Sequence, residues 1–257
     1  MNWWNPLRQP GLLSEEDSYF QLECYRWLLM NFGGDSFYKN SGLILPTVEY
    51  FPAMVTSDES AARTTFSQVL KHAGMVDWPV NLVMQSEDPD RVVGPSLLIQ
   101  SKDHNPLGTF SVSENHEVTI TYNPKVVSNP MSMVATFAHE LAHYLTGYAK
   151  SSPPGGWENW EFATDIAATF MGFGIFQANS AFNFKQYSTP DGMGWETSGA
   201  GYLTVAEHSY ALAVFLKLKN IDPKIAMPHC DPNVKHNLKK ALKELDRNDV
   251  IAILKAI

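Results

Sequence analysis

The first half of the chain alternates between helical and strand-like patterns of apolar residues. Ser14 and Asp17 have the spacing of a capping box, which predicts a helix to about residue 31. A second helical pattern runs from residue 58 or 60 to Gly74. Short runs between turn-forming residues predict strands over residues 42–45, 80–84, 96–100, 108–112 and 116–122. Because stretches rich in Gly, Pro, Asn and Asp separate the last four runs, we expect antiparallel connections.

From residue 130 onward, every periodic segment has helical spacing. Asn129 and Pro130 have the residue types of an N-cap and a first helical residue, and Gly147 predicts the end of this helix. Its apolar residues recur at intervals of three and four: Met131, Val134, Phe137, Ala138, Leu141, Ala142 and Leu145. A second apolar helix follows the helix-breaking residues 151–156, and residues 233–257 predict an amphipathic helix with a solvated basic face.

The order of these elements predicts an α+β fold. We expect a mixed lobe of helices and antiparallel sheet over residues 1–125, followed by a mainly helical lobe over residues 126–257. These two parts form either separate lobes or one continuous domain. With 257 residues, of which 44% are hydrophobic, the chain is long enough to bury a sizeable core.

Composition and charge narrow the functional classes. The net charge of −8 argues against a nucleic-acid partner, which favours a basic face. The longest largely apolar run, residues 166–176, is too short to span a bilayer, and the first residues lack the features of a signal peptide. Cys24 and Cys230 lie far apart without metal-site spacing, which is typical of reduced thiols. We therefore expect a cytoplasmic protein without a membrane partner, of unspecified oligomeric state.

Residues 139–143 carry the strongest chemical signal. They read His-Glu-Leu-Ala-His within the predicted 130–147 helix. Residues i and i+4 of a helix share a face, so His139 and His143 can direct two imidazoles to one metal ion. Glu140, beside the first histidine, can take a proton from water in the fourth coordination position. This spacing indicates a zinc-dependent hydrolase.

A catalytic zinc site needs a third protein ligand. The longer metzincin motif would have a histidine at position 149, where the chain has Ala149. Glu161 and Asp165 lie one turn apart on the next predicted helix and share a face. They can act as a metal ligand and as the carboxylate that orients a metal-bound histidine. Glu158 is the rival third ligand, although it has no acidic partner at i+4.

The two motifs over residues 131–165 resemble those of the gluzincin metallopeptidases, the group that includes thermolysin. In that group His-Glu-x-x-His lies on one helix and Glu-x-x-x-Asp on the next. The resemblance implies a zincin-like fold with Zn²⁺ bound by His139, His143 and Glu161. It also implies that Asp165 hydrogen-bonds a histidine, for which we expect His139.

By the same resemblance, the expected activity is hydrolysis of peptide or protein substrates with Glu140 as the general base. In gluzincins an edge strand beside the active site holds an extended peptide, and either residues 108–112 or residues 116–122 can have that position. Each run is otherwise a plain half-buried strand. The alternative to a peptidase is a zinc-binding sensor or regulatory protein with a peptidase-like fold.

A donor to the developing oxyanion is also expected. Thr204 and Glu207 form a capping box, and His208 then lies on an otherwise apolar helix face. His208 is either a core histidine, an oxyanion donor or a zinc ligand in place of Glu161. Tyr202, which precedes this helix, is the other donor candidate, and residues 191–194 are a candidate flap.

Overall fold

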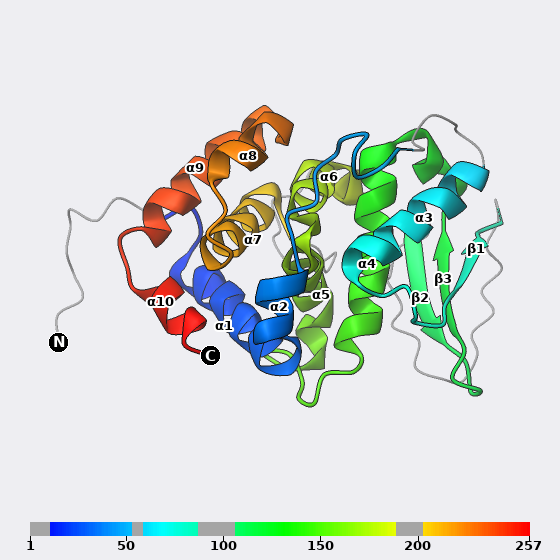
Figure 1. Cartoon of the computed structure of the whole chain (residues 1–257), viewed down its shortest axis with the longest axis horizontal. Coiled ribbons are helices and arrows are strands. Elements are labelled where there is room, and N and C mark those ends of the chain that lie inside the picture. Colours follow the sequence, from blue (N-terminus) through cyan, green and yellow to red (C-terminus); the bar gives the residue numbers. More distant parts are fainter. Residues whose placement is uncertain (1–10, 53–58, 87–105, 189–202) are drawn as a thin grey trace.

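The computed structural model describes residues 11–52, 59–86, 106–188 and 203–257. Within these residues a small sheet adjoins a larger set of helices (Figure 1). The strands are β1 (Asn81–Met84), β2 (Gly108–Val112) and β3 (Val118–Tyr122). The helices are α1 (Glu15–Phe32), α2 (Asp35–Asn40), α3 (Glu59–Ala73), α4 (Pro130–Thr146), α5 (Trp160–Ala168), α6 (Gly174–Ser188), α7 (Val205–Leu218), α8 (Pro223–Ala226), α9 (Pro232–Leu245) and α10 (Val250–Lys255). Single helical turns are η1 (Pro124–Ser128), η2 (Trp157–Asn159), η3 (Thr169–Phe173) and η4 (Met227–His229). The prediction of a mixed helix-and-sheet protein is confirmed.

The sheet has the strand order β1-β3-β2, so β3 lies at its centre. β2 is antiparallel to β3, as predicted, whereas β1 is parallel to β3. The expectation of antiparallel connections is therefore wrong for β1. A parallel neighbour needs a long connection, and β2 lies within the connection between β1 and β3. The predicted strand over residues 96–100 lies outside the described residues.

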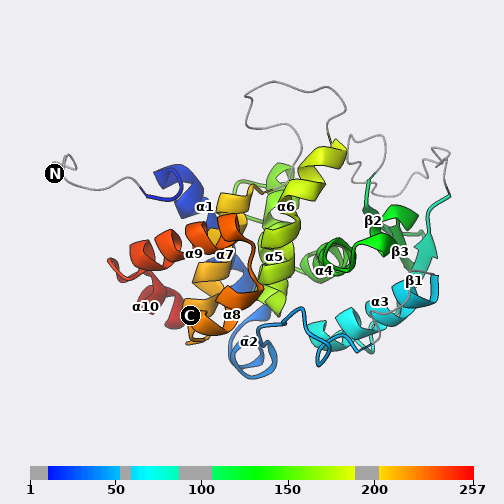
Figure 2. The ribbon, with the colours of Figure 1, turned by 90° about the horizontal axis from the view of Figure 1, so that it is seen from above.

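α4 is the central helix of the fold. It begins as predicted, because the Asn129 side chain accepts a hydrogen bond from Ser132 N–H and Pro130 occupies the first turn. Figure 2 shows α4 nearly end-on, with the sheet and α3 on one side and α5 and α6 on the other. Because both sides are covered, nearly the whole helix is buried, including its histidines. A polar group on α4 must therefore find its partners inside the protein.

A helical break at Gly172 separates α5 from α6. Gly172 has a φ of 106°, which favours glycine, and it lies in the wide turn η3. A Cβ atom at this position would lie 2.0 Å from Gly42 O, so the break also allows a close backbone contact. Ile44 N–H donates to Gly172 O at 3.0 Å. The predicted strand over residues 42–45 is wrong, because this segment pairs with the break and with no strand of the described sheet.

Residues from both predicted lobes lie on the helical side of α4. α1 packs against α5, α7 and α10, whereas α3 lies on the other side of α4 with the sheet (Figure 1). The structure therefore places residues 15–32 beside the second half of the chain. The division of the chain at residue 125 stays a prediction.

The C-terminal segment differs in detail from its prediction. Residues 233–257 do not form one helix: α9 ends at Leu245, and α10 begins at Val250. The Glu244 carboxylate accepts a hydrogen bond from Leu12 N–H at 2.9 Å and so joins α9 to the start of the described chain. Over the described ranges, no helix has both the length and the apolar character required to cross a membrane.

Candidate metal centre

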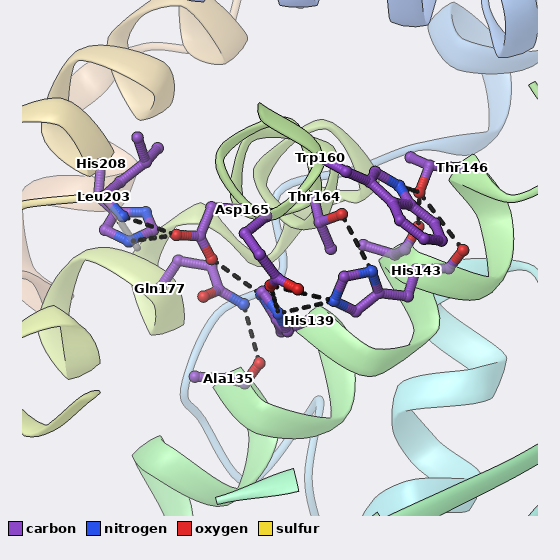
Figure 3. Close-up of polar contacts among 12 residues, drawn as sticks. Ala135, His139, His143, Thr146, Trp160, Thr164, Asp165, Gln177, Leu203 and His208 are labelled. Atoms are coloured by element: carbon purple, nitrogen blue, oxygen red, sulfur yellow. Dashed lines mark hydrogen bonds and ion pairs between the residues drawn. The ribbon is translucent and has the colours of Figure 1, made fainter. Parts of the chain in front are cut away.

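Two helices supply the three candidate metal ligands. His139 and His143 lie one turn apart on α4, as the i, i+4 spacing predicts, and both are buried. Glu161 lies in the first turn of α5, with 22% of its side chain exposed. Trp160 fixes the start of α5 on the end of α4, because its Nε1–H donates to Thr146 Oγ1 at 2.7 Å. Figure 3 shows this contact between Trp160 and Thr146 beside His143. The start of α5 thereby lies at the two histidines, and the Glu161 carboxylate is 3.3 Å from each of them.

The three ligand atoms form a nearly equilateral triangle. His139 Nε2 and His143 Nε2 are 3.1 Å apart, and each is 3.3 Å from Glu161 Oε2. Ligand atoms at tetrahedral zinc, with bonds of about 2.0–2.1 Å, lie about 3.3–3.4 Å from each other. The triangle therefore has the size of one face of a zinc coordination tetrahedron, which leaves a fourth position open. In the described part of the chain, this is the one group of such residues close enough to hold a metal ion.

The far nitrogen of each histidine ring has its own partner. His139 Nδ1 lies 2.9 Å from Asp165 Oδ1, and because a carboxylate accepts, Nδ1 carries the proton. Thr164 Oγ1 lies 3.3 Å from His143 Nδ1, where it can accept from the ring N–H. Neutral rings with protonated Nδ1 atoms have lone pairs on Nε2. The neighbour of His139 therefore favours the tautomer that a metal ion requires, and the neighbour of His143 is compatible with it.

The charges at the triangle favour a cation. Burial lowers the pKa of His139, but hydrogen bonds to Asp165 and Glu161 outweigh this effect and raise it well above 6.5. Burial raises the pKa of Glu161, but the hydrogen bonds from His139 and His143 outweigh this effect and hold its pKa well below the usual range. Burial lowers the pKa of His143. The two carboxylates thus stabilise positive charge between the ligand atoms, whether a proton or a metal ion carries it.

Aromatic rings enclose the second ligand. The His143 ring lies edge-on to Trp160, with ring centroids 5.0 Å apart. On β2, the Phe110 ring is nearly parallel to His143, with centroids 6.0 Å apart. These contacts restrict rotation of the imidazole and lower the local polarity.

Glu140 is buried between α4 and the beginning of β2. Its Oε1 and Cγ atoms approach Gly108 so closely that a Cβ atom there would lie 2.8 and 3.1 Å from them. Burial, together with the charges of Glu161 and Asp165, raises the pKa of Glu140 to about 8, although His139 opposes the shift. The absence of a side chain at Gly108 therefore leaves space for a carboxyl group beside the first ligand.

No family model, curated protein or solved structure matches this chain. The resemblance to gluzincins therefore rests on the sequence motifs alone, and the structure adds only that His139, His143 and Glu161 lie close together.

The structure separates the other predicted site residues from the triangle. Glu158 is exposed on η2 and does not belong to the group of ligand atoms, so its alternative role as third ligand is wrong. His208 also lies outside that group: its Nε2 atom faces Asp165 Oδ2 at 3.6 Å, behind His139. It is therefore not among the candidate zinc ligands, and its role as an oxyanion donor stays a prediction. Tyr202 and the candidate flap at residues 191–194 lie outside the described residues.

Sequence reasoning missed four residues at the centre. Thr164 and Trp160 contact His143, Phe110 stacks on it, and Gly108 contacts Glu140. Only Thr164 could have been inferred, because it lies three residues after Glu161 on the same helix. Of the two candidate edge strands, residues 116–122 are excluded because β3 is central, and β2 lies at the edge of the described sheet.

Proposed function

We propose that this protein is a zinc-dependent hydrolase, and that it is a peptidase of the gluzincin type. The observation that carries the proposal is the triangle of His139 Nε2, His143 Nε2 and Glu161 Oε2, whose edges of 3.1–3.3 Å suit tetrahedral zinc. Three protein ligands with an open fourth position are typical of catalytic zinc sites, whereas structural sites have four protein ligands.

The residues around the triangle have complementary roles in this proposal. Bound Zn²⁺ would supply a Lewis acid that polarises a carbonyl group and makes water more acidic. Glu140 takes the proton that water loses as its oxygen bonds to the carbonyl carbon, and donates it to the amine nitrogen as the C–N bond breaks. Asp165 and Thr164 hold the two imidazoles with their Nε2 atoms toward the centre.

The location of β2 supports a peptide as the substrate. This strand contacts α4, and its Phe110 side chain stacks on His143. An extended peptide can add to the edge of a sheet through backbone hydrogen bonds. A peptide paired with β2 in this way would pass close to Gly108 and Glu140, and hence to the ligand triangle.

The first test of the proposal is the metal content of protein purified without added metal or chelator. We expect about one zinc per chain in the wild type, as the single group of candidate ligands among the described residues implies. Glu161→Gln is expected to lose most of this zinc. Glu158→Gln is the matched control, because it makes the same change on an exposed glutamate three residues away and should retain the metal.

The second test separates metal binding from catalysis. Glu140→Gln should retain zinc and lose hydrolysis of a fluorogenic peptide library, because the amide cannot take up the proton. Wild-type protein with less than about half an equivalent of zinc would contradict the metal site. Hydrolysis that persists in Glu140→Gln would contradict the general-base role. A wild type that binds zinc and cleaves no peptide of the library would support the sensor alternative instead.

A further inference from the structure

Asp165 is approached by three residues that belong to two separate parts of the chain. Its Oδ1 atom accepts from His139 Nδ1–H on α4, and its Oδ2 atom accepts from Leu203 N–H, both at 2.9 Å. His208 Nε2, on α7, lies 3.6 Å from the same Oδ2 atom. All three contacts are visible in Figure 3, with Asp165 between His139 and His208. Only 3% of the Asp165 side chain is exposed, so bulk water does not compete for its oxygens.

The two carboxylate oxygens of Asp165 have different partners. Leu203 and His208 both approach Oδ2, so the remaining oxygen is directed to His139. A carboxylate with a fixed plane restrains the imidazole that it binds, and the orientation of a ligand histidine affects metal affinity. Residues that hold Asp165 in place therefore affect the orientation of His139 indirectly, through Asp165.

The face of α7 on which His208 lies is otherwise apolar. The residue is 1% exposed, and its neighbours along the helix face include Leu212. Nδ1 has no hydrogen-bond partner among the residues that the structure describes. A leucine or phenylalanine would fill such a position without burying an unpaired nitrogen, so packing alone does not account for a histidine here. The polar group that its side chain approaches, within the described part of the chain, is the Asp165 carboxylate.

We infer that His208 is a positioning residue that holds Asp165, and through Asp165 the ring of His139, in the geometry for metal binding. The inference rests on the proposed metal centre and assigns to it a contribution from α7, which provides no ligand. The separation of 3.6 Å exceeds that of a hydrogen bond, so in this structure the His208 ring lies beside Oδ2 without a hydrogen bond to it. Such contacts commonly shorten when a site is loaded.

The inference is tested by the zinc dissociation constant, measured by competition with a chromophoric chelator. His208→Phe keeps a buried ring and removes the N–H, and His208→Gln keeps an N–H donor at a similar reach. Loss of a direct partner of a ligand histidine costs about 10–100-fold in affinity, and because His208 is one contact further away we expect about 3–10-fold for His208→Phe. His208→Gln should remain within about twofold of the wild type.

Leu212→Ala is the matched control, because it removes buried packing on the same face of α7 without removing a polar atom. It should lower the free energy of unfolding in urea and leave zinc affinity unchanged. If His208→Phe does not fold, His208→Leu, which has a smaller apolar side chain, replaces it.

If His208→Phe bound zinc as tightly as the wild type does, the inference would be overturned, while the proposed metal centre would stand. An equal loss in His208→Gln and His208→Phe would also overturn it, because the donor would then be irrelevant. A weakened affinity in Leu212→Ala as large as that in His208→Phe would assign the effect to packing and overturn the positioning role. A wild type that binds no zinc would instead contradict the proposed function itself.

Discussion

Gly108→Ala is the most informative single change at the centre, because it adds one methyl group beside Glu140 and removes no polar atom. The added Cβ would lie 2.7 Å from Thr136 Cγ2 and 2.8 Å from Glu140 Oε1. The φ angle of Gly108 is not positive, so alanine is compatible with the backbone at this position. The contact with α4 therefore determines the effect of the substitution.

The required displacement gives the size of the effect. Ordinary van der Waals contact begins at 3.4 Å, so the Glu140 oxygen must move by about 0.6 Å if the backbone stays in place. A displacement of about 1 Å can reduce an enzymatic rate about 100-fold. We therefore expect kcat/KM for peptide hydrolysis to fall by about 10–100-fold, which is about 1.4–2.8 kcal/mol. The nearest atoms to the added methyl group belong to no metal ligand, so zinc affinity should stay within about twofold of the wild type.

The assay pairs peptide hydrolysis with chelator competition on the same preparations. Gly42→Ala is the control, because a Cβ atom there would have no atom within 4 Å. An unchanged kcat/KM in Gly108→Ala would refute the argument that this glycine leaves the space for the general base. A large loss of zinc would refute it as well, because the methyl group would then act on the ligands.

Three further predictions concern the ligands' partners, the helical break and pH. Asp165→Asn should weaken zinc binding about 10–100-fold in chelator competition, because one amide oxygen cannot accept from both His139 and Leu203; Thr164→Val should cost less than about tenfold, because His143 loses only a neutral partner. Gly172→Ala should lower the free energy of unfolding in urea by about 2–4 kcal/mol, because of its positive φ and the contact with Gly42 O. Burial lowers the pKa of His208 below 6.5, so the unfolded chain binds more protons in acid, and the stability that His208 contributes should fall from pH 7.5 to 5. The stability of the zinc-free wild type relative to His208→Gln, measured in urea at both pH values, checks this sign.

Each of these predictions has an outcome that contradicts it. A larger loss of zinc affinity in Thr164→Val than in Asp165→Asn would show that the carboxylate is not the stronger partner. Wild-type stability in Gly172→Ala would mean that the break between α5 and α6 tolerates a side chain. A stability difference for His208→Gln that is constant or grows toward pH 5 would contradict a neutral buried ring.

The candidate ligands could be predicted from the sequence because their arrangement depends on local periodicity. The Asn129 cap and the spacing of the apolar residues predict the helix α4. Because His139 and His143 are four residues apart on this helix, they must share a face. Glu161 and Asp165 follow from the same argument on α5. The structure adds the distances between atoms on the two helices, which no spacing along one helix can provide.

The remaining features depend on contacts between segments far apart in the chain. Burial of His208 follows from its apolar helix face, but its contact with Asp165 depends on how α7 packs on α5. The parallel pairing of β1 was missed because short turn-rich separators between strands suggest hairpins, while β2 here pairs with the far side of β3. The segment at residues 42–45 has an apolar strand pattern, but its backbone partner is the glycine at the helical break. In each case the local sequence pattern is compatible with more than one arrangement, and tertiary packing determines which arrangement forms.

The distance between α4 and α5 is the quantity on which the whole site depends, because two ligands lie on one helix and the third on the other. Trp160 ties the start of α5 to Thr146 near the end of α4. On α6, beyond the break, Gln177 Nε2–H donates to Ala135 O of α4 at 2.9 Å. Functional groups must be held within about 0.5 Å of their productive positions, and two polar bridges at separate points fix both the spacing and the register of the helices. A bound metal ion would add a third bridge between them, so the same contacts that shape the triangle should also determine how much metal binding stabilises the fold.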